Sequence, residues 1–246
     1  MQENWFKDWF NTPYYHLLYK NRDEQEAANF IDKLLNYLRP VQNSKMRDVA
    51  CGKGRLAIQM SNKGFDVTGI DLSEESIQIA LESENDQLHF YKHDMRTPFW
   101  INYFDYAFNF FTSFGYFKTE RENNNAIQSI ASALNQNGIF VIDYINSKYA
   151  EQKIVHKTEL DIDGIFFTIT RWYDDQKFYK KILVEDPSIA QPISFTEEVA
   201  RFTTEDFSRF FKKNNLVIKE IFGDYQLNSF KEDSSERLII IAQKVL

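Results

Sequence analysis

The sequence is poor in the residues that build covalently stapled or metal-held folds. It has a single cysteine, Cys51, and four histidines among 246 residues. One thiol cannot form an internal disulfide, and a cysteine-rich zinc site needs more ligands than these. We therefore expect no metal centre, and a fold that is held together by its hydrophobic core.

Long hydrophobic runs and clusters of basic residues are also missing. Every apolar run ends well before the roughly 18 residues that would indicate a membrane span. The first ten residues, MQENWFKDWF, lack the basic region and apolar stretch of a secretory signal. The net charge is -7, and no basic tail is present to bind phosphates. We expect a cytoplasmic protein that binds neither a membrane nor nucleic acid.

The composition is that of a globular chain, with 43% hydrophobic and 26% charged residues. The length allows one large domain, or one domain of about 180 residues with a small insertion. Up to Asn146, hydrophobic periodicity predicts alternating helices and strands, which indicates a parallel sheet covered by helices on both faces. The predicted strands are 45–50, 65–70, 88–92, 104–110 and 139–145, and the predicted helices are 23–38, 54–63, 73–81 and 121–134.

The pattern changes after Asn146. Residues 152–202 are rich in Ile, Val, Phe, Thr and Tyr and contain several turn signals, which predicts three or four antiparallel strands. A helix over 204–213 and strands over 217–222 and 237–244 follow. Because no helix separates the last two strands, we expect them to form an antiparallel hairpin at the edge of the main sheet.

The segment Asp48-Val-Ala-Cys-Gly-Lys-Gly-Arg55 puts a glycine loop between a predicted strand and a predicted helix. Gly52 and Gly54 allow the backbone to approach a ligand closely, and the amino end of the helix favours an anion. Gly52-x-Gly54-x-x-Ala57 also satisfies the dinucleotide-binding pattern, although so short a pattern occurs by chance. A plain strand-to-helix turn is the alternative interpretation.

Polar residues stand at the ends of three further strands. Asp71 follows the second strand, 19 residues after Gly52, where a carboxylate can accept both hydroxyls of a ribose. Asp94 follows the third strand, and Asn109 lies at the end of the fourth. The carboxyl ends of adjacent parallel strands surround one crevice, so these side chains are expected to point into the same ligand site.

With these motifs in this order, the chain from about residue 23 onward resembles the class I S-adenosylmethionine-dependent methyltransferases. Asp48-x-Ala-Cys-Gly-x-Gly is similar to the family's first motif, Gly-Ile-Asp71-Leu-Ser to its second, and Asp94-Met95 to its third. The resemblance implies an α/β, Rossmann-like seven-stranded sheet of order 3-2-1-4-5-7-6 and S-adenosylmethionine as the cofactor. The antiparallel insertion resembles the small-molecule branch, which includes sugar-amine and glycine-type N-methyltransferases.

The resemblance also implies an organisation of the chain. Residues 1–22 would form an N-terminal lid, residues 23–146 and 203–246 the cofactor-binding domain, and residues 147–202 an antiparallel insertion on the acceptor side. We expect a monomer or a homodimer. Arg47 departs from the family pattern, which usually has an apolar residue there. Asn109 is not followed by Pro-Pro-Tyr, which argues against methylation of adenine bases or of glutamine amides.

Roles for single residues follow from the same resemblance. Gly52 and Gly54 would lie against the methionine part of the cofactor, Asp71 would hold the ribose, and Asp94 the adenine amine. Arg22 is a candidate partner for the cofactor's carboxylate, with an ordinary surface arginine as the alternative. The expected cofactor contacts are Arg22, Ala50, Cys51, Gly52, Gly54, Asp71, Leu72, Asp94, Met95 and Asn109.

The N-terminal segment is rich in aromatic residues that a short helix would bring onto neighbouring turns. It is expected either to fold over the crevice as a lid or to pack on the body as ordinary structure. In similar small-molecule enzymes this stretch carries tyrosines near the transferred methyl group, which makes Tyr14, Tyr15 and Tyr19 candidates. A tyrosine offers negative potential to a sulfonium without being a strong nucleophile. His16 is the acid–base candidate beside them.

We therefore expect a methyltransferase that acts on an N or O atom of a small-molecule acceptor by in-line displacement. Such a reaction depends on positioning and desolvation more than on acid–base groups. One alternative is an NAD(P)-dependent oxidoreductase, which the glycine pattern favours but which does not require Asp94. The other is a non-catalytic module that binds the cofactor as a sensor.

Overall fold

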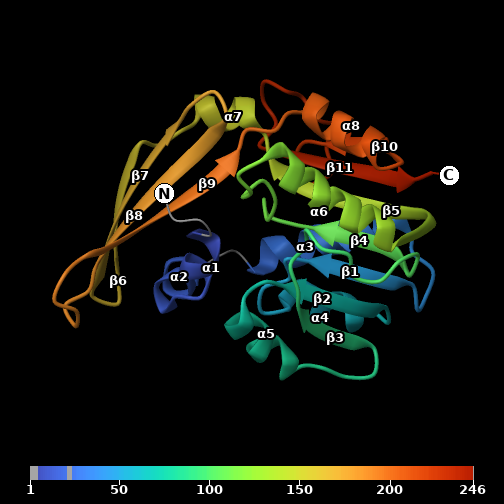
Figure 1. Cartoon of the computed structure of the whole chain (residues 1–246), viewed down its shortest axis with the longest axis horizontal. Coiled ribbons are helices and arrows are strands. Elements are labelled where there is room, and N and C mark those ends of the chain that lie inside the picture. Colours follow the sequence, from blue (N-terminus) through green and yellow to red (C-terminus); the bar gives the residue numbers. More distant parts are fainter. Residues whose placement is uncertain (1–4, 21–23, 246) are drawn as a thin grey trace.

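The computed structural model describes residues 5–20 and 24–245 and consists of a seven-stranded and a four-stranded sheet with their helices (Figure 1). The larger sheet has the order β3-β2-β1-β4-β5-β11-β10, in which β11 runs antiparallel to β5 and to β10. Counted within this sheet, the order is the predicted 3-2-1-4-5-7-6, and the late hairpin is confirmed. Its strands are β1 (Lys45–Val49), β2 (Asp66–Asp71), β3 (Leu88–Lys92), β4 (Phe104–Asn109), β5 (Leu134–Ile145), β10 (Leu216–Phe222) and β11 (Arg237–Lys244).

Helices cover both faces of this sheet, as the strand–helix alternation predicts. Alternate residues of β5 enter opposite cores, with Phe140 and Ile142 on one side and Val141 on the other. The first core is closed by α6 (Glu120–Ala133) and α8 (Thr204–Lys213), and the second by α3 (Glu24–Leu38), α4 (Arg55–Ser61) and α5 (Glu74–Leu81). The chain is therefore a doubly covered α/β fold.

Two elements differ from the predicted pattern near residues 134–152. Strand β5 begins at Leu134, where the sequence indicates the end of a helix, because Leu134 already pairs with Phe104 across a register irregularity. A short helix, α7 (Ser147–Gln152), opens the insertion and was not predicted. Its cap is readable in the sequence, since the Asn146 side chain accepts a hydrogen bond from the backbone N–H of Lys148.

The insertion forms the separate four-stranded antiparallel sheet, and the two N-terminal helices lie between it and the main body (Figure 1). Its strands are β6 (Lys157–Ile162), β7 (Ile165–Tyr173), β8 (Lys177–Glu185) and β9 (Ile193–Ala200), and the helices are α1 (Trp5–Phe10) and α2 (Pro13–Leu18). Trp9 of α1 is fully buried in a small core with Phe167 and Ile182 of this sheet. The insertion therefore has a hydrophobic core of its own, which the N-terminal helices complete.

Arg47, the departure from the family pattern, is fully buried in β1. Its guanidinium has no hydrogen-bond partner among the described residues and lies 5.3 Å from the centre of the Phe99 ring. Burial lowers the pKa of Arg47 to about 10. The central strand therefore holds a positive charge against aromatic ring faces, where the family pattern has an apolar side chain.

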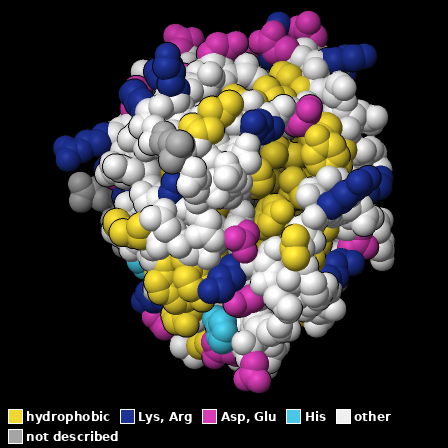
Figure 2. Space-filling model, turned by 90° about the vertical axis from the view of Figure 1, so that its right-hand side faces the viewer, with side chains coloured by type: hydrophobic (Ala, Val, Ile, Leu, Met, Phe, Trp, Pro, Cys, Tyr) yellow, Lys and Arg dark blue, Asp and Glu magenta, His cyan; other side chains and the backbone are white. Residues whose placement is uncertain are grey.

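The face of the molecule that carries the C-terminus also carries loops that lead into the parallel strands. Figure 2 shows this face, on which hydrophobic side chains lie among scattered charged ones. The hydrophobic side chains exposed in the loops before β1 and β4 are Val41, Trp100 and Ile101. No helix in the described ranges has the length and apolar content that crossing a membrane requires. The cavity described next lies at the opposite edge of the sheet.

Candidate active site

A cavity of about 550 Å³ lies at the carboxyl ends of the parallel strands. Its walls come from α1 and α2, the glycine loop, the segments after β2, β3 and β4, and Glu197 of β9. The predicted site residues that line it are Tyr15, His16, Tyr19, Ala50, Cys51, Gly52, Asp71, Leu72, Asp94 and Met95. Tyr14, Gly54 and Asn109 do not line it, and Arg22 lies outside the described residues.

The two glycines of the loop have different roles. A Cβ atom added to Gly52 would meet nothing within 4 Å, so this residue keeps the cavity wall open. A Cβ atom on Gly54 would lie 2.5 Å from the Phe90 ring, so Gly54 serves close packing and the left-handed start of α4. Beside Gly52 stands Cys51, whose thiol pKa burial raises well above the usual range. The thiol is therefore unreactive at neutral pH.

Asp71 fixes the loop and faces the cavity. Its Oδ2 accepts a hydrogen bond of 2.8 Å from the Gly52 N–H, and its Oδ1 accepts one of 2.8 Å from the Ser73 N–H. Burial raises the pKa of Asp71, and these two hydrogen bonds act in the opposite direction. Neighbouring Asp48 is also buried, and burial together with the charge of Asp71 raises its pKa to about 7. The loop is thus anchored by Asp71, and both acids line the cavity.

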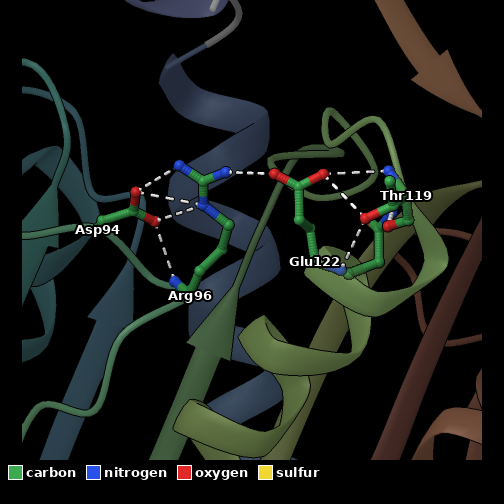
Figure 3. A network of polar contacts seen from close by, with 5 residues as sticks. Asp94, Arg96, Thr119 and Glu122 are labelled. Carbon is green, nitrogen blue, oxygen red and sulfur yellow. Dashed lines mark hydrogen bonds and ion pairs between the residues drawn. The ribbon is translucent and has the colours of Figure 1, made fainter.

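Asp94 is held by a partner that the motifs do not indicate (Figure 3). Arg96 donates from Nη2 to Asp94 Oδ2 at 2.7 Å and from Nε to Oδ1 at 3.1 Å. Its Nη1 donates to Glu122 Oε1 at 2.7 Å, and Glu122 in turn forms the capping box of α6 with Thr119. The carboxylate that faces the cavity is therefore oriented by a charge-assisted network reaching α6.

Glu197 is a site residue that sequence reasoning missed. Its Oε1 accepts hydrogen bonds from Trp9 Nε1 at 2.7 Å and from the Tyr19 hydroxyl at 2.8 Å. Lys180 lies 3.7 Å from Oε2 and contacts the Tyr19 hydroxyl. Glu197 thus ties the N-terminal helices to β9 while it lines the cavity. Its partners lie 188 and 178 positions away, and no local pattern links residues so far apart.

The four candidates for chemistry near the methyl group separate in space. Tyr15, His16 and Tyr19 line the cavity, whereas Tyr14 turns away from it and donates from its hydroxyl to Asp186 at 2.9 Å. The expectation that Tyr14 lies at the site is thus not met, because α2 presents it to a loop of the insertion. Burial, followed by the charge of Lys53, lowers the pKa of His16, so its ring is neutral near pH 7.

Two cations, Lys53 in the glycine loop and Arg55 at the first position of α4, also line the cavity. Lys53 and Arg55 form no ion pair with another described residue. Their position in the loop and directly after it is the signal that sequence reasoning missed when it proposed Arg22. Asn109, in contrast, is fully buried, and its Nδ2 donates to the Val49 carbonyl at 2.9 Å. It joins the ends of β1 and β4 beneath the cavity.

Residues 40–215 match the protein family described as a methyltransferase domain. A putative methyltransferase, YqeM of Bacillus subtilis, is 28% identical over 222 residues, which cover 82% of this chain and 85% of that protein. A dTDP-3-amino-3,4,6-trideoxy-alpha-D-glucopyranose N,N-dimethyltransferase of Streptomyces venezuelae is 32% identical over 131 residues, 52% of this chain and 54% of that protein. The fold is similar to that of an S-adenosylmethionine-dependent methyltransferase from Clostridium acetobutylicum, with a TM-score of 0.78, 19% identity and coverage of 95% and 96%.

Proposed function

Since the chain belongs to the class I S-adenosylmethionine-dependent methyltransferases, we propose that it methylates the nitrogen of a small amine. The observation that carries this proposal is the carboxylate of Glu197 in the cavity wall. A second support is the similarity to the sugar-amine dimethyltransferase over about half of each chain. Family membership decides against the nicotinamide-dependent oxidoreductase and the non-catalytic module as interpretations of the glycine loop.

The residues around the glycine loop fit S-adenosylmethionine. Asp71 would accept the ribose hydroxyls and Asp94 the adenine amine, while the open side of Gly52 leaves space for the methionine part. Lys53 and Arg55 would pair with the cofactor's carboxylate. When bound, the cofactor supplies a methyl group activated by a positively charged sulfur. The chain's own residues then have to bind, orient and desolvate the acceptor.

Glu197 and the α2 side chains provide the chemistry that an amine acceptor needs. The other acids that line the cavity, Asp48, Asp71 and Asp94, all belong to the cofactor motifs, which leaves Glu197 for the acceptor. The Glu197 carboxylate can bind the acceptor's ammonium group beside Lys180, which lies 3.7 Å from Oε2, and the neutral ring of His16 can take the proton that the amine must lose. Tyr15 and Tyr19 would present ring faces and hydroxyls to the reacting centre.

The N-terminal helices would also keep water out of the reaction. Trp5, Phe6 and Phe10 line the cavity, and Asn11 accepts a hydrogen bond of 2.6 Å from the Ser73 hydroxyl. Residues 5–20 thereby connect the acceptor side to the start of α5. We infer that this segment is the lid of the site and that the insertion shapes the acceptor pocket.

The proposal is tested by measuring the rate at which S-adenosylhomocysteine is released when an amine, or its hydroxyl analogue, is supplied as the acceptor. The amines to compare with their hydroxyl analogues are glycine, small alkylamines and an amino sugar nucleotide. We expect turnover with at least one of the amines and with none of the hydroxyl analogues. Glu197→Gln should lower kcat/KM for that amine about 10- to 100-fold and leave S-adenosylhomocysteine affinity unchanged. The matched control is Glu198→Gln, because the neighbouring Glu198 pairs with Lys177 at 2.7 Å and does not line the cavity. Turnover of hydroxyl acceptors alone would contradict the assignment.

A further inference from the structure

The turn after β4 has a backbone that its residues do not favour. The N–H of Ser113 donates to the Phe110 carbonyl at 3.2 Å, and both central residues are left-handed, with φ of 56° at Phe111 and 60° at Thr112. Turns with two left-handed central residues are normally built from Gly, Asn or Asp. A bulky or β-branched residue in this region is an outlier. Groups outside the turn must therefore hold it in place.

A buried pair on β5 and β11 supplies these groups. Asp143 is fully buried, its Oδ2 accepts from the Phe111 N–H at 2.8 Å, and its carbonyl accepts from the Thr112 N–H at 3.0 Å. Arg237 donates from Nε to Asp143 Oδ1 at 2.8 Å and from Nη2 to the Thr112 hydroxyl at 2.9 Å. The Tyr225 hydroxyl donates to the same carboxylate at 3.1 Å. Both central N–H groups and the threonine hydroxyl are thus bonded to neighbouring strands.

The turn positions two residues that line the cavity, Phe111 and Tyr116. Phe111 lines it, and the guanidinium of Arg55, the first residue of α4 after the glycine loop, lies 5.9 Å from the centre of the Phe111 ring. The Thr112 carbonyl accepts a hydrogen bond of 2.6 Å from the hydroxyl of Tyr116, which also lines the cavity. The Tyr116 ring makes an edge contact with Trp5 of α1, at 5.5 Å between centres. The turn therefore contacts the start of α4 directly and the N-terminal helices through Tyr116.

We propose that Asp143 and Arg237 are positioning residues that hold the strained turn and thereby complete the cofactor site. The pair touches neither the cavity nor the reacting atoms and acts through Phe111 and Tyr116. Losing Arg237 would leave the Thr112 hydroxyl oxygen and Oδ1 of Asp143 without their donor, and the turn would relax to a conformation that its residues prefer. The proposal rests on the family's cofactor and is independent of which acceptor is methylated.

Calorimetry with S-adenosylhomocysteine tests this role through a rescue. Arg237→Gln should weaken the affinity about tenfold. Arg237→Gln combined with Thr112→Asn should return it to within about threefold of the parent protein, because asparagine adopts left-handed φ without external support. Thr112→Val, which removes the hydroxyl and keeps the β-branch, should weaken binding in the same direction even if Arg237→Gln fails to fold. The control is Arg209→Gln, which removes a surface ion pair to Asp206 on α8.

Amide hydrogen exchange supplies the second readout. In Arg237→Gln we expect faster exchange confined to residues 110–117 and to α1, with β1 and β2 unchanged. The proposal would be overturned if exchange became faster over all of β5 and β11 and if Thr112→Asn did not restore the affinity. Asp143 and Arg237 would then only stabilise the packing of their strands. Unchanged affinity in Arg237→Gln and Thr112→Val would also overturn the proposal. Failure of the parent protein to bind S-adenosylhomocysteine would instead contradict the cofactor itself.

Discussion

The cavity joins two halves that the chain builds in different ways. In the half that we propose binds the cofactor, called the cofactor half below, Asp48 in β1, Asp71 at the end of β2 and Asp94 after β3 reach the cavity from neighbouring strand ends of one parallel sheet. In the half that we propose binds the acceptor, called the acceptor half below, α1 and α2 meet β9, and Glu197 is bonded to residues 188 and 178 positions away. The first half is fixed by the sheet's topology, whereas the second depends on a few long-range hydrogen bonds and a small hydrophobic core.

This difference predicts that substitutions in the cofactor half lower the affinity for S-adenosylhomocysteine. Substitutions in the acceptor half should instead weaken the packing of the N-terminal helices on β9 and lower the turnover. The halves meet through the hydrogen bond from the Ser73 hydroxyl to Asn11 and through ring contacts of α1 with the main body, such as that of Trp5 with Tyr116. Substitutions that test each half separately can therefore confirm or break the comparison.

The largest effect is expected for Asp71→Ala in the cofactor half. The change removes the carboxylate that would bind the ribose and that also anchors the Gly52 and Ser73 N–H groups. Affinity for S-adenosylhomocysteine should fall by about 2–4 kcal/mol, measured by calorimetry. Asp66→Ala at the opposite end of β2 is the matched control and should leave affinity unchanged. Equal affinity in the two variants would remove Asp71 from the site.

Glu197→Ala should show the complementary behaviour in the acceptor half. It leaves the Trp9 indole N–H and the Tyr19 hydroxyl without their acceptor, which should lower the free energy of unfolding by about 1–3 kcal/mol. Tryptophan fluorescence during urea unfolding measures this loss, because Trp9 is fully buried beside the contact. Affinity for S-adenosylhomocysteine should change by less than about twofold. A large loss of cofactor affinity here would mean that the two halves are coupled.

The contrast between the halves also explains what the sequence can predict. The strand order, the glycine loop and the cavity positions of Asp71 and Asp94 follow from local patterns and from the rule that parallel strands end at one crevice. Glu197 cannot be found in this way, because its partners come from the other end of the chain. Tyr14 and Tyr15 are adjacent in sequence, and only the packing of α2 decides which one reaches the cavity.

Other misses have physical causes of the same kind. Arg47 breaks the hydrophobic pattern of β1 and is nevertheless fully buried, because ring faces of residues distant in sequence surround it. Arg96 follows the Asp94-Met95 motif directly, but its second partner, Glu122, lies 26 positions further along the chain in another helix. Local periodicity reports which residues are buried in a regular element and not which charges meet between elements.

In the cofactor half, the raised pKa of Asp48 should make the free energy of unfolding depend on pH. Burial raises its pKa to about 7, so the folded protein keeps a proton that the unfolded chain, with the ordinary aspartate pKa of 3.8, has already released. Stability from this group therefore falls as the pH rises from about 4 to about 7 and is constant above. The advantage of Asp48→Asn over the parent protein should grow by up to about 1.4 kcal/mol per pH unit in that window. Urea unfolding at several pH values across and above this window measures the difference, and a flat difference would show that Asp48 ionises normally.

The smallest effect is expected for Tyr14→Phe. This substitution tests whether the acceptor pocket ends at Glu197. The Tyr14 hydroxyl bonds Asp186 outside the cavity, and water can replace both partners, so the free energy of unfolding should change by no more than about 0.5 kcal/mol. Tyr19→Phe removes a hydroxyl that bonds Glu197, and it should cost about 1 kcal/mol. Only Tyr19→Phe should also slow release of S-adenosylhomocysteine with the amine acceptor, since only Tyr19 lines the cavity. If Tyr14→Phe lost as much turnover as Tyr19→Phe, the acceptor pocket would have to extend to the loop of Asp186, and Glu197 would no longer mark its boundary.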